Sequence, residues 1–211
     1  ATLENILITH THADHSPGAL ALHEATGARL IGLKAPDVAG HDKTFVPDRL
    51  FSDEDIVDCG EYKIQLIANP GHVSNHICFL LRDEQLLFTG DHVLQGTTPV
   101  ILPPDGDMAA YLEALERLLT IPLKLLAPAH GDVMFQPYAE IEKLIAHRLK
   151  REQKVLAGLD SLGACSLDEL VVTVYDDVSP QLIPWAKKTL MAHLIKLQQE
   201  GRVSEDNELW Q

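Results

Sequence analysis

Cysteine is scarce in this 211-residue sequence, which has three, Cys59, Cys78 and Cys165, all far apart. Because no CxxC pair occurs, neither a disulfide framework nor a cysteine-based zinc site is indicated. Proteins that depend on disulfides work in oxidising compartments, so the scarcity favours a reducing, cytoplasmic location.

Long apolar runs are also missing. No stretch approaches the ~20 residues that a membrane-spanning helix needs, and no signal peptide is visible. We therefore expect no membrane partner.

Positive charge is in short supply, with 17 Lys and Arg against 31 Asp and Glu and a formal net charge of −14. Such a surface should repel nucleic acid at long range. Residues 1–136 hold 8 Lys/Arg and 19 Asp/Glu, whereas residues 137–211 hold 9 and 12. Short apolar strands alternate with helices before residue 136, and nearly everything after it has a helical pattern. We therefore predict two domains, residues 1–136 and residues 137–211.

Histidine, by contrast, is concentrated in one short stretch, THTHADH, residues 9–15. The i, i+2 spacing puts His10 and His12 on one side of an extended segment. Asp14 and His15 come after a bend and can face a second point nearby. A helix is expected directly afterwards, at residues 17–26, with Ser16 as its N-cap. So many imidazoles and a carboxylate in one turn indicate metal binding.

Four predicted strands each end next to a residue that could bind a metal ion. The strand at residues 5–9 leads into the histidine cluster, and those at 62–68, 86–89 and 124–127 precede His72, Asp91 and His130. Alternating strands and helices predict an α/β fold, which places its clefts at the carboxyl ends of strands. Five histidines and two aspartates are enough for two divalent metal ions. Zinc suits these donors best, and iron and manganese are the alternatives.

The motifs HTHADH, PGH at residues 70–72, GD at 90–91 and PAHG at 128–131 occur in an order that resembles the metallo-β-lactamase fold hydrolases. The resemblance covers the first ~135 residues and implies an αββα sandwich. It implies that one metal ion is held by His10, His12 and His72. A second would be held by Asp14, His15 and His130, and Asp91 would bridge the two.

A hydroxide held between the metal ions would then be the nucleophile, and Asp14 would be the catalytic residue that orients it or accepts its proton. True β-lactamases of this fold generally lack the bridging aspartate, so Asp91 favours glyoxalase II-type thioesterases, ribonucleases and related enzymes. We expect a hydrolase of an ester, thioester or phosphodiester, with a small-molecule or RNA substrate. Endoribonuclease action on single-stranded RNA is the alternative.

The second part has the pattern of a winged helix. One long helix, or two, is expected at residues 137–159, with Leu149 on the apolar face. A helix capped by Ser166 and Glu169 and another at residues 184–200 are expected to follow. A short hairpin follows. Together with LIxHRxxRE at residues 144–152, this is similar to the β-lactamase-like protein 2 and glyoxalase II-like subgroup.

Three lysines, Lys187, Lys188 and Lys196, lie where a recognition helix would be. The segment is net negative, so sequence-specific DNA binding is not expected. The module is instead expected to pack on the first domain and wall its cleft. His147 and Arg148 could then reach substrate, or form salt bridges.

Only eight residues precede the histidine cluster, whereas the family has several strands there. We therefore expect this sequence, which starts at Ala1, to be a fragment with its N-terminal strands missing. The other hypothesis is accordingly a truncated, non-catalytic module that binds metal or associates with nucleic acid.

Overall fold

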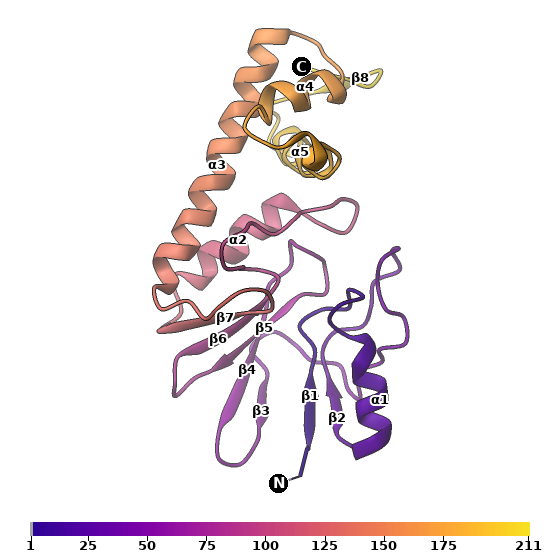
Figure 1. Ribbon diagram of the computed structural model, residues 1–211, viewed down its shortest axis with the longest axis vertical. Helices are drawn as coiled ribbons and strands as arrows, with labels where there is room; N and C mark the ends of the chain where they lie inside the picture. The colour runs from indigo at the N-terminus through magenta and orange to yellow at the C-terminus, as the bar shows by residue number, and fades with distance from the viewer. Residues whose placement is uncertain (1) are drawn as a thin grey trace.

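A five-stranded mixed sheet forms the centre of the computed structural model, which describes residues 2–211 (Figure 1). Its strand order is β3-β4-β5-β6-β7. The strands are β3 Ile56–Asp58, β4 Lys63–Ala68, β5 Ile77–Leu81, β6 Leu86–Gly90 and β7 Leu125–Pro128. Neighbours are antiparallel from β3 to β6, and β6 and β7 are parallel. Strands β4, β6 and β7 therefore run in the same direction, and their carboxyl ends share one edge of the sheet.

A second, two-stranded sheet lies beside the first and is made of β1 (Asn5–Leu7) and β2 (Arg29–Ile31) in parallel. The helix α1 (Pro17–Thr26) connects them. The backbone N–H of Ile77 donates to the carbonyl of Thr9 at 2.8 Å, which ties the end of β1 to the start of β5.

Ser16 occupies the predicted N-cap position of α1, but its side chain does not cap the helix. Its side chain makes no capping hydrogen bond, and its hydroxyl donates to Asp42 Oδ2 at 2.8 Å instead. The loop that carries Asp42 competes for the hydroxyl, and Pro17 at the start of the helix needs no partner for its nitrogen.

Helix α2 (Met108–Leu118) packs against the five-stranded sheet through the apolar face that its helical spacing predicts. Tyr111, Leu115 and Leu118 are fully buried there against Leu87 and Leu126 of the sheet. Asp107 accepts hydrogen bonds from the first N–H groups of the helix and caps it.

The C-terminal part consists of helices and one small hairpin. Its elements are α3 Pro137–Leu162, α4 Leu167–Val174, the 3₁₀ turn η1 Pro180–Leu182, α5 Ile183–Gln199, β8 Glu205–Asp206 and β9 Leu209–Trp210. Ser166 and Glu169 form the predicted capping box. Three helices followed by a two-stranded wing confirm the winged-helix prediction.

Helix α3 belongs to two cores (Figure 1). Its first half places Ile141 and Leu144 against α2 and the sheet, and its second half packs Val155 against α4 and α5. The domain boundary at residues 136–137 stays a prediction.

Leu149 was expected on the apolar face of α3, but it is 43% exposed. The side of α3 that carries it turns toward solvent between the two cores.

Within residues 2–211, none of the helices combines the length and the hydropathy that a bilayer-spanning segment requires.

Candidate metal centre

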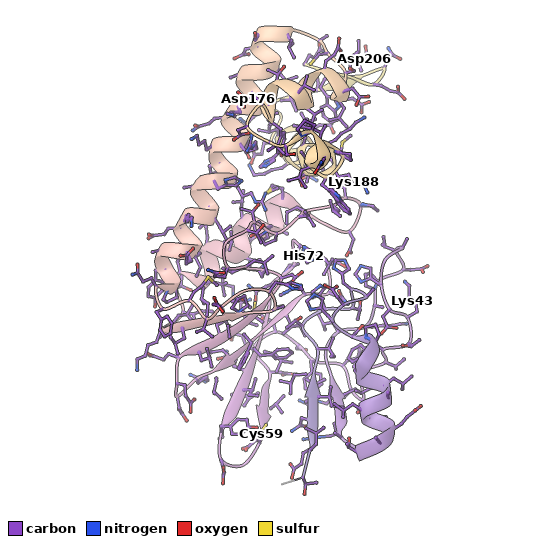
Figure 2. The ribbon with its side chains drawn as sticks, viewed as in Figure 1. Lys43, Cys59, His72, Asp176, Lys188 and Asp206 are labelled. Carbon is purple, nitrogen blue, oxygen red and sulfur yellow. The ribbon has the colours of Figure 1, made fainter. Side chains whose placement is uncertain are left out.

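All seven predicted ligand residues converge at one place between the two sheets, near the labelled His72 in Figure 2. The turn after β1 supplies four of them, and the segments after β4, β6 and β7 supply His72, Asp91 and His130. The convergence follows from topology, because β4, β6 and β7 end at the same edge of the sheet. The hydrogen bond between Ile77 and Thr9 brings the histidine turn to this edge.

The first group consists of His10, His12 and His72. His12 Nδ1 lies 3.1 Å from His10 Nε2 and 3.2 Å from His72 Nε2. Nitrogens at ~2.0–2.1 Å from one tetrahedral zinc ion would lie roughly 3.3 Å apart. The three nitrogens are therefore spaced as ligands of one ion.

The second group consists of Asp14, His15 and His130. Asp14 Oδ2 lies 3.5 Å from His15 Nε2 and 3.3 Å from His130 Nε2. These distances, too, are compatible with a shared ion.

Asp91 lies between the two groups. Its Oδ2 is 3.5 Å from His15 Nε2 and 3.7 Å from His72 Nε2, and its Oδ1 is 3.6 Å from His130 Nε2. Its carboxylate therefore contacts members of both groups, as a bridging ligand would.

Burial keeps the imidazoles of the first group neutral, so that their lone pairs are available. Desolvation, reinforced by neighbouring histidines, lowers the pKa of His10 far below its usual value. Desolvation and then His72 lower the pKa of His12 to about 4. Burial also lowers the pKa of His72. Burial alone would raise the pKa of Asp91, but the adjacent imidazoles, that of His15 above all, outweigh it and lower this pKa.

Hydrogen bonds from outside the groups orient these ligands. His72 Nδ1 lies 2.7 Å from the carbonyl of Val100, so it carries the proton and leaves the Nε2 lone pair toward His12. His10 Nδ1 contacts the hydroxyl of Thr9 at 3.2 Å.

Two glycines let the chain approach the centre closely. Gly71 precedes His72, has φ +137°, and a Cβ there would lie 2.4 Å from the Cα of Tyr111. Gly90 precedes Asp91, has φ +50°, and its Cβ would lie 2.6 Å from His76 Nε2. The glycines of PGH and GD are therefore required by packing and backbone conformation.

The donor set fits two divalent metal ions. His15 Nε2 and Asp91 Oδ1 are buried and have no hydrogen-bond partner among the described residues, although each lies within 4 Å of other members of the cluster. Buried polar atoms normally find partners. Bound cations would satisfy both atoms, and imidazole and carboxylate donors suit zinc, iron or manganese.

Comparison with known families agrees with this geometry. The model of the metallo-beta-lactamase superfamily matches residues 1–130, and that of the beta-lactamase associated winged helix domain matches residues 166–210. The chain belongs to the metallo-beta-lactamase superfamily.

Individual relatives match nearly the whole chain. A beta-lactamase-like protein 2 homolog of Drosophila melanogaster is 29% identical over 212 residues, covering 96% of this chain and 71% of the relative. An atrochrysone carboxyl ACP thioesterase of Aspergillus fumigatus is 29% identical over 210 residues, covering 90% and 62%. The chain thus spans about two thirds of the length of these relatives.

Solved structures show the same fold. A beta-lactamase domain protein from Burkholderia ambifaria superposes with a TM-score of 0.82 at 21% identity, over 99% of this chain and 73% of that one. TTHA1623, solved in a di-iron-bound form, has a TM-score of 0.53 at 25% identity, over 64% of this chain and 73% of that one. Members of the superfamily typically bind metal ions, and relatives named as thioesterases support a hydrolase, as the sequence predicts.

One neighbour of the metallo-beta-lactamase centre was not predicted. His41 Nε2 lies 3.0 Å from Asp105 Oδ2, and His41 Nδ1 lies 2.7 Å from the hydroxyl of Thr11. The His41 ring packs 5.0 Å from that of His12, centroid to centroid. Asp105 therefore holds His41 beside the centre. No local signal reveals this, because the two residues are 64 positions apart.

Three further histidines, His23, His76 and His92, differ in their distance from the centre. His76 and His92 are fully buried near the centre, and His76 Nε2 accepts the backbone N–H of Asp91 at 3.1 Å. His23 of α1 is partly buried, and its Nδ1 lies 2.8 Å from the carbonyl oxygen of Ala28. That contact holds the end of α1 near β2.

Proposed function

We propose that the chain is a dinuclear metal-dependent hydrolase that cleaves thioesters. The observation that carries the proposal is the arrangement of two ligand groups around Asp91. Two relatives named as atrochrysone carboxyl ACP thioesterases support the substrate class; the second, from Emericella nidulans, is 29% identical over 96% of this chain.

His10, His12 and His72 would hold one ion, Asp14, His15 and His130 the other, and Asp91 both. When bound, two dications would supply hydroxide near neutral pH by lowering the pKa of water held at these residues. Asp14, whose side chain is 60% exposed, faces the open side of the centre and can orient the attacking water or accept its proton. Addition of that water to the carbonyl carbon breaks the carbon–sulfur bond, and the proton goes to the departing thiolate.

Charge favours a thioester over RNA. The net charge of −14 opposes binding of a polyanion. On α5, Lys187 is paired with Asp168 at 2.5 Å and Lys196 with Glu152 at 2.8 Å. Two of the three lysines that could have formed a basic helix face are thus neutralised by carboxylates of the same module, and the third, Lys188, lies over the ring of Trp185.

The test combines metal analysis with three substrates: an S-acyl thiol, single-stranded RNA and nitrocefin. We expect two ions per chain, hydrolysis of the S-acyl thiol, and weak or absent turnover of nitrocefin. Asp91→Ala should lower the rate by more than about 1,000-fold, beyond the effect typical of losing one oxyanion donor, and should reduce the metal content.

Asp83→Ala, in the turn between β5 and β6, is the matched control and should leave both the hydrolysis rate and the metal content unchanged. Full activity of Asp91→Ala would reject the mechanism. Two bound ions with cleavage of RNA alone would replace the thioesterase by a ribonuclease. Two bound ions with no turnover of any substrate would indicate a non-catalytic metal-binding module.

A further inference from the structure

A cavity of about 500 Å³ lies between the winged-helix part and the loop that follows Asp91. Residues 97–100 form one side of it, and α3, α5 and the segment before α5 form the other. In Figure 1, α5 lies directly above this loop. Val100 lines the cavity and its carbonyl accepts the proton of His72 Nδ1 at 2.7 Å. The cavity is therefore one residue away from a candidate metal ligand.

Apolar side chains make up much of the wall. Trp185 and Leu182 line the cavity, yet they are 50% and 54% exposed. Pro99 and Val178 are also part of the lining. A half-exposed tryptophan facing a concave surface is a common binding element for a flat apolar group.

Arg148 of α3 lines the same cavity and is only 3% exposed. One of its terminal nitrogens donates to the carbonyl of Pro99, and its Nε has no hydrogen-bond partner. No carboxylate within residues 2–211 forms an ion pair with it, so the structure contradicts the salt-bridge role that the sequence suggested as an alternative. Its guanidinium carbon instead lies 5.4 Å from the centroid of the Tyr111 ring, a contact that supplies no counter-charge. A buried charge without a counter-ion is costly.

The other buried arginine of the cavity differs in this respect. Arg151 donates to both oxygens of Asp177 at 2.8 and 3.2 Å and to the carbonyl of Val174 at 2.6 Å. Its charge is thus compensated within the protein. Arg148 is left as the arginine in this cavity whose charge a ligand could neutralise.

We propose that this cavity binds a flat, apolar group that carries a single carboxylate, with Arg148 pairing with the carboxylate and Trp185 stacking on the apolar part. Given the proposed function, such a group would be the acyl portion of the substrate, an aromatic or polycyclic acyl group that bears one free carboxylate besides its thioester carbonyl. Arg148 is the uncompensated arginine of the lining and matches one negative charge; Lys188, outside the lining, lies 5.1 Å from the centroid of the Trp185 ring and leaves the face of that ring toward the cavity to the ligand. A chain of phosphates would bring several charges to a surface that is net negative.

Binding of two matched probes tests the proposal without any turnover. Dissociation constants of 2-naphthoate and its uncharged analogue 2-naphthamide are measured by equilibrium dialysis, with both zinc-loaded and metal-free protein. We expect the carboxylate to bind at least about tenfold more tightly, the scale of one hydrogen-bonded charge pair. The preference should be the same in both metal states, because Arg148 and not the metal centre supplies it.

Variants assign the preference to its residue. Arg148→Met should make the two probes bind equally while leaving the affinity for the amide within about threefold. Arg148→Lys keeps a charge and should retain part of the preference. Arg151→Met removes an arginine of the same helix whose charge is already compensated, and should retain the preference. Trp185→Ala should weaken binding of both probes.

Four outcomes would overturn the proposal. The probes could bind equally to the wild-type protein, or the preference could survive in Arg148→Met. The preference could be lost with the metal ions, which would place the carboxylate on the metal centre. Finally, 2-naphthyl phosphate could bind more tightly than 2-naphthoate, which would assign a phosphate site. If Arg148→Met fails to fold, the wild-type protein still decides the matter. The ratio of its dissociation constants for the two probes, measured with and without zinc, tests the proposal by itself. Binding without thioester hydrolysis would leave the cavity assigned and reject the proposed function alone.

Discussion

The two ligand groups of the centre differ in burial at two of their three ligands, while the third ligand of each, His12 and His15, is partly buried. His10 and His72 of the first group are 1% and 5% exposed. The side chains of Asp14 and His130 in the second are 60% and 51% exposed. Asp91, with a side chain 13% exposed, lies between them. The centre is therefore half enclosed and half open.

The difference has consequences for binding. The first group is held in place by packing and by hydrogen bonds to Thr9 and Val100, so little conformational entropy is lost when an ion binds. The second group contains exposed side chains that must be ordered on binding. It also opens to solvent, where a substrate must enter. We infer that the buried group binds its ion more tightly and that the open group serves substrate access.

The largest expected effect comes from removing one histidine of each group. His72→Ala should weaken binding of the tighter ion by more than about 100-fold, since losing a group that merely orients a ligand already costs 10- to 100-fold. His130→Ala should retain the tighter ion and lose the weaker one. Competition with a chelating dye measures both affinities, and His23→Ala, outside the centre, should match the wild-type protein.

Loss of the tighter ion in His130→Ala, with its retention in His72→Ala, would reverse the inferred order of the two groups.

A smaller effect is expected from Gly90→Ala, which probes how tightly the enclosed half is packed. The added Cβ would lie 2.6 Å from His76 Nε2 and 2.8 Å from the Cβ of Thr9. Overpacking of this kind costs about 1–3 kcal/mol, in addition to roughly 1 kcal/mol for a left-handed backbone. Urea unfolding of the metal-free protein should show a loss of stability equal to the sum of these two costs.

Gly27→Ala is the control for backbone strain alone, because Gly27 is left-handed (φ +72°, ψ +10°) and a Cβ there meets nothing within 4 Å. Equal losses of stability in the two variants would mean that the enclosed half can relax, and the argument for its rigidity would fail.

Much of this enclosed half could be predicted from the sequence. Each strand is a short apolar run that ends at a distinctive residue, and the carboxyl ends of such strands meet in α/β folds. The capping box at Ser166 and Glu169 is a local signal too, and it occurs as predicted.

Contacts made across the fold could not be predicted. His41 reaches Asp105 from a loop 64 residues away, and Ser16 bonds Asp42 instead of capping its own helix. The uncompensated charge of Arg148 could not be predicted either. The motif LIxHRxxRE places Arg148 and Arg151 on the same face of one helix. Only the fold brings Asp177 to Arg151 and leaves Arg148 without a carboxylate.

The smallest effect concerns His193 on α5, which is as buried as His10 but lies outside the metal centre. Both of its ring nitrogens lack partners among the described residues. Burial, followed by the charges of Arg148, Lys196, Arg151 and His147, lowers its pKa from 6.5 to about 3. It therefore shows what burying an imidazole costs when no ion compensates.

Because the pKa is lower in the folded state, the unfolded chain takes up a proton first as the pH falls below 6.5. Stability should therefore be lost between pH 6.5 and 3 and be unaffected above pH 7. Between pH 7.5 and 5.0 the loss should be about 2 kcal/mol.

The measurement is urea unfolding of metal-free protein at the two pH values, with His193→Gln as the variant that lacks the titrating group. The metal-centre histidines contribute equally to both proteins and cancel in the difference. If wild type and His193→Gln lose the same stability on acidification, the imidazole is accessible to protons in the folded state, and burial alone would not explain why the enclosed half of the centre stays neutral.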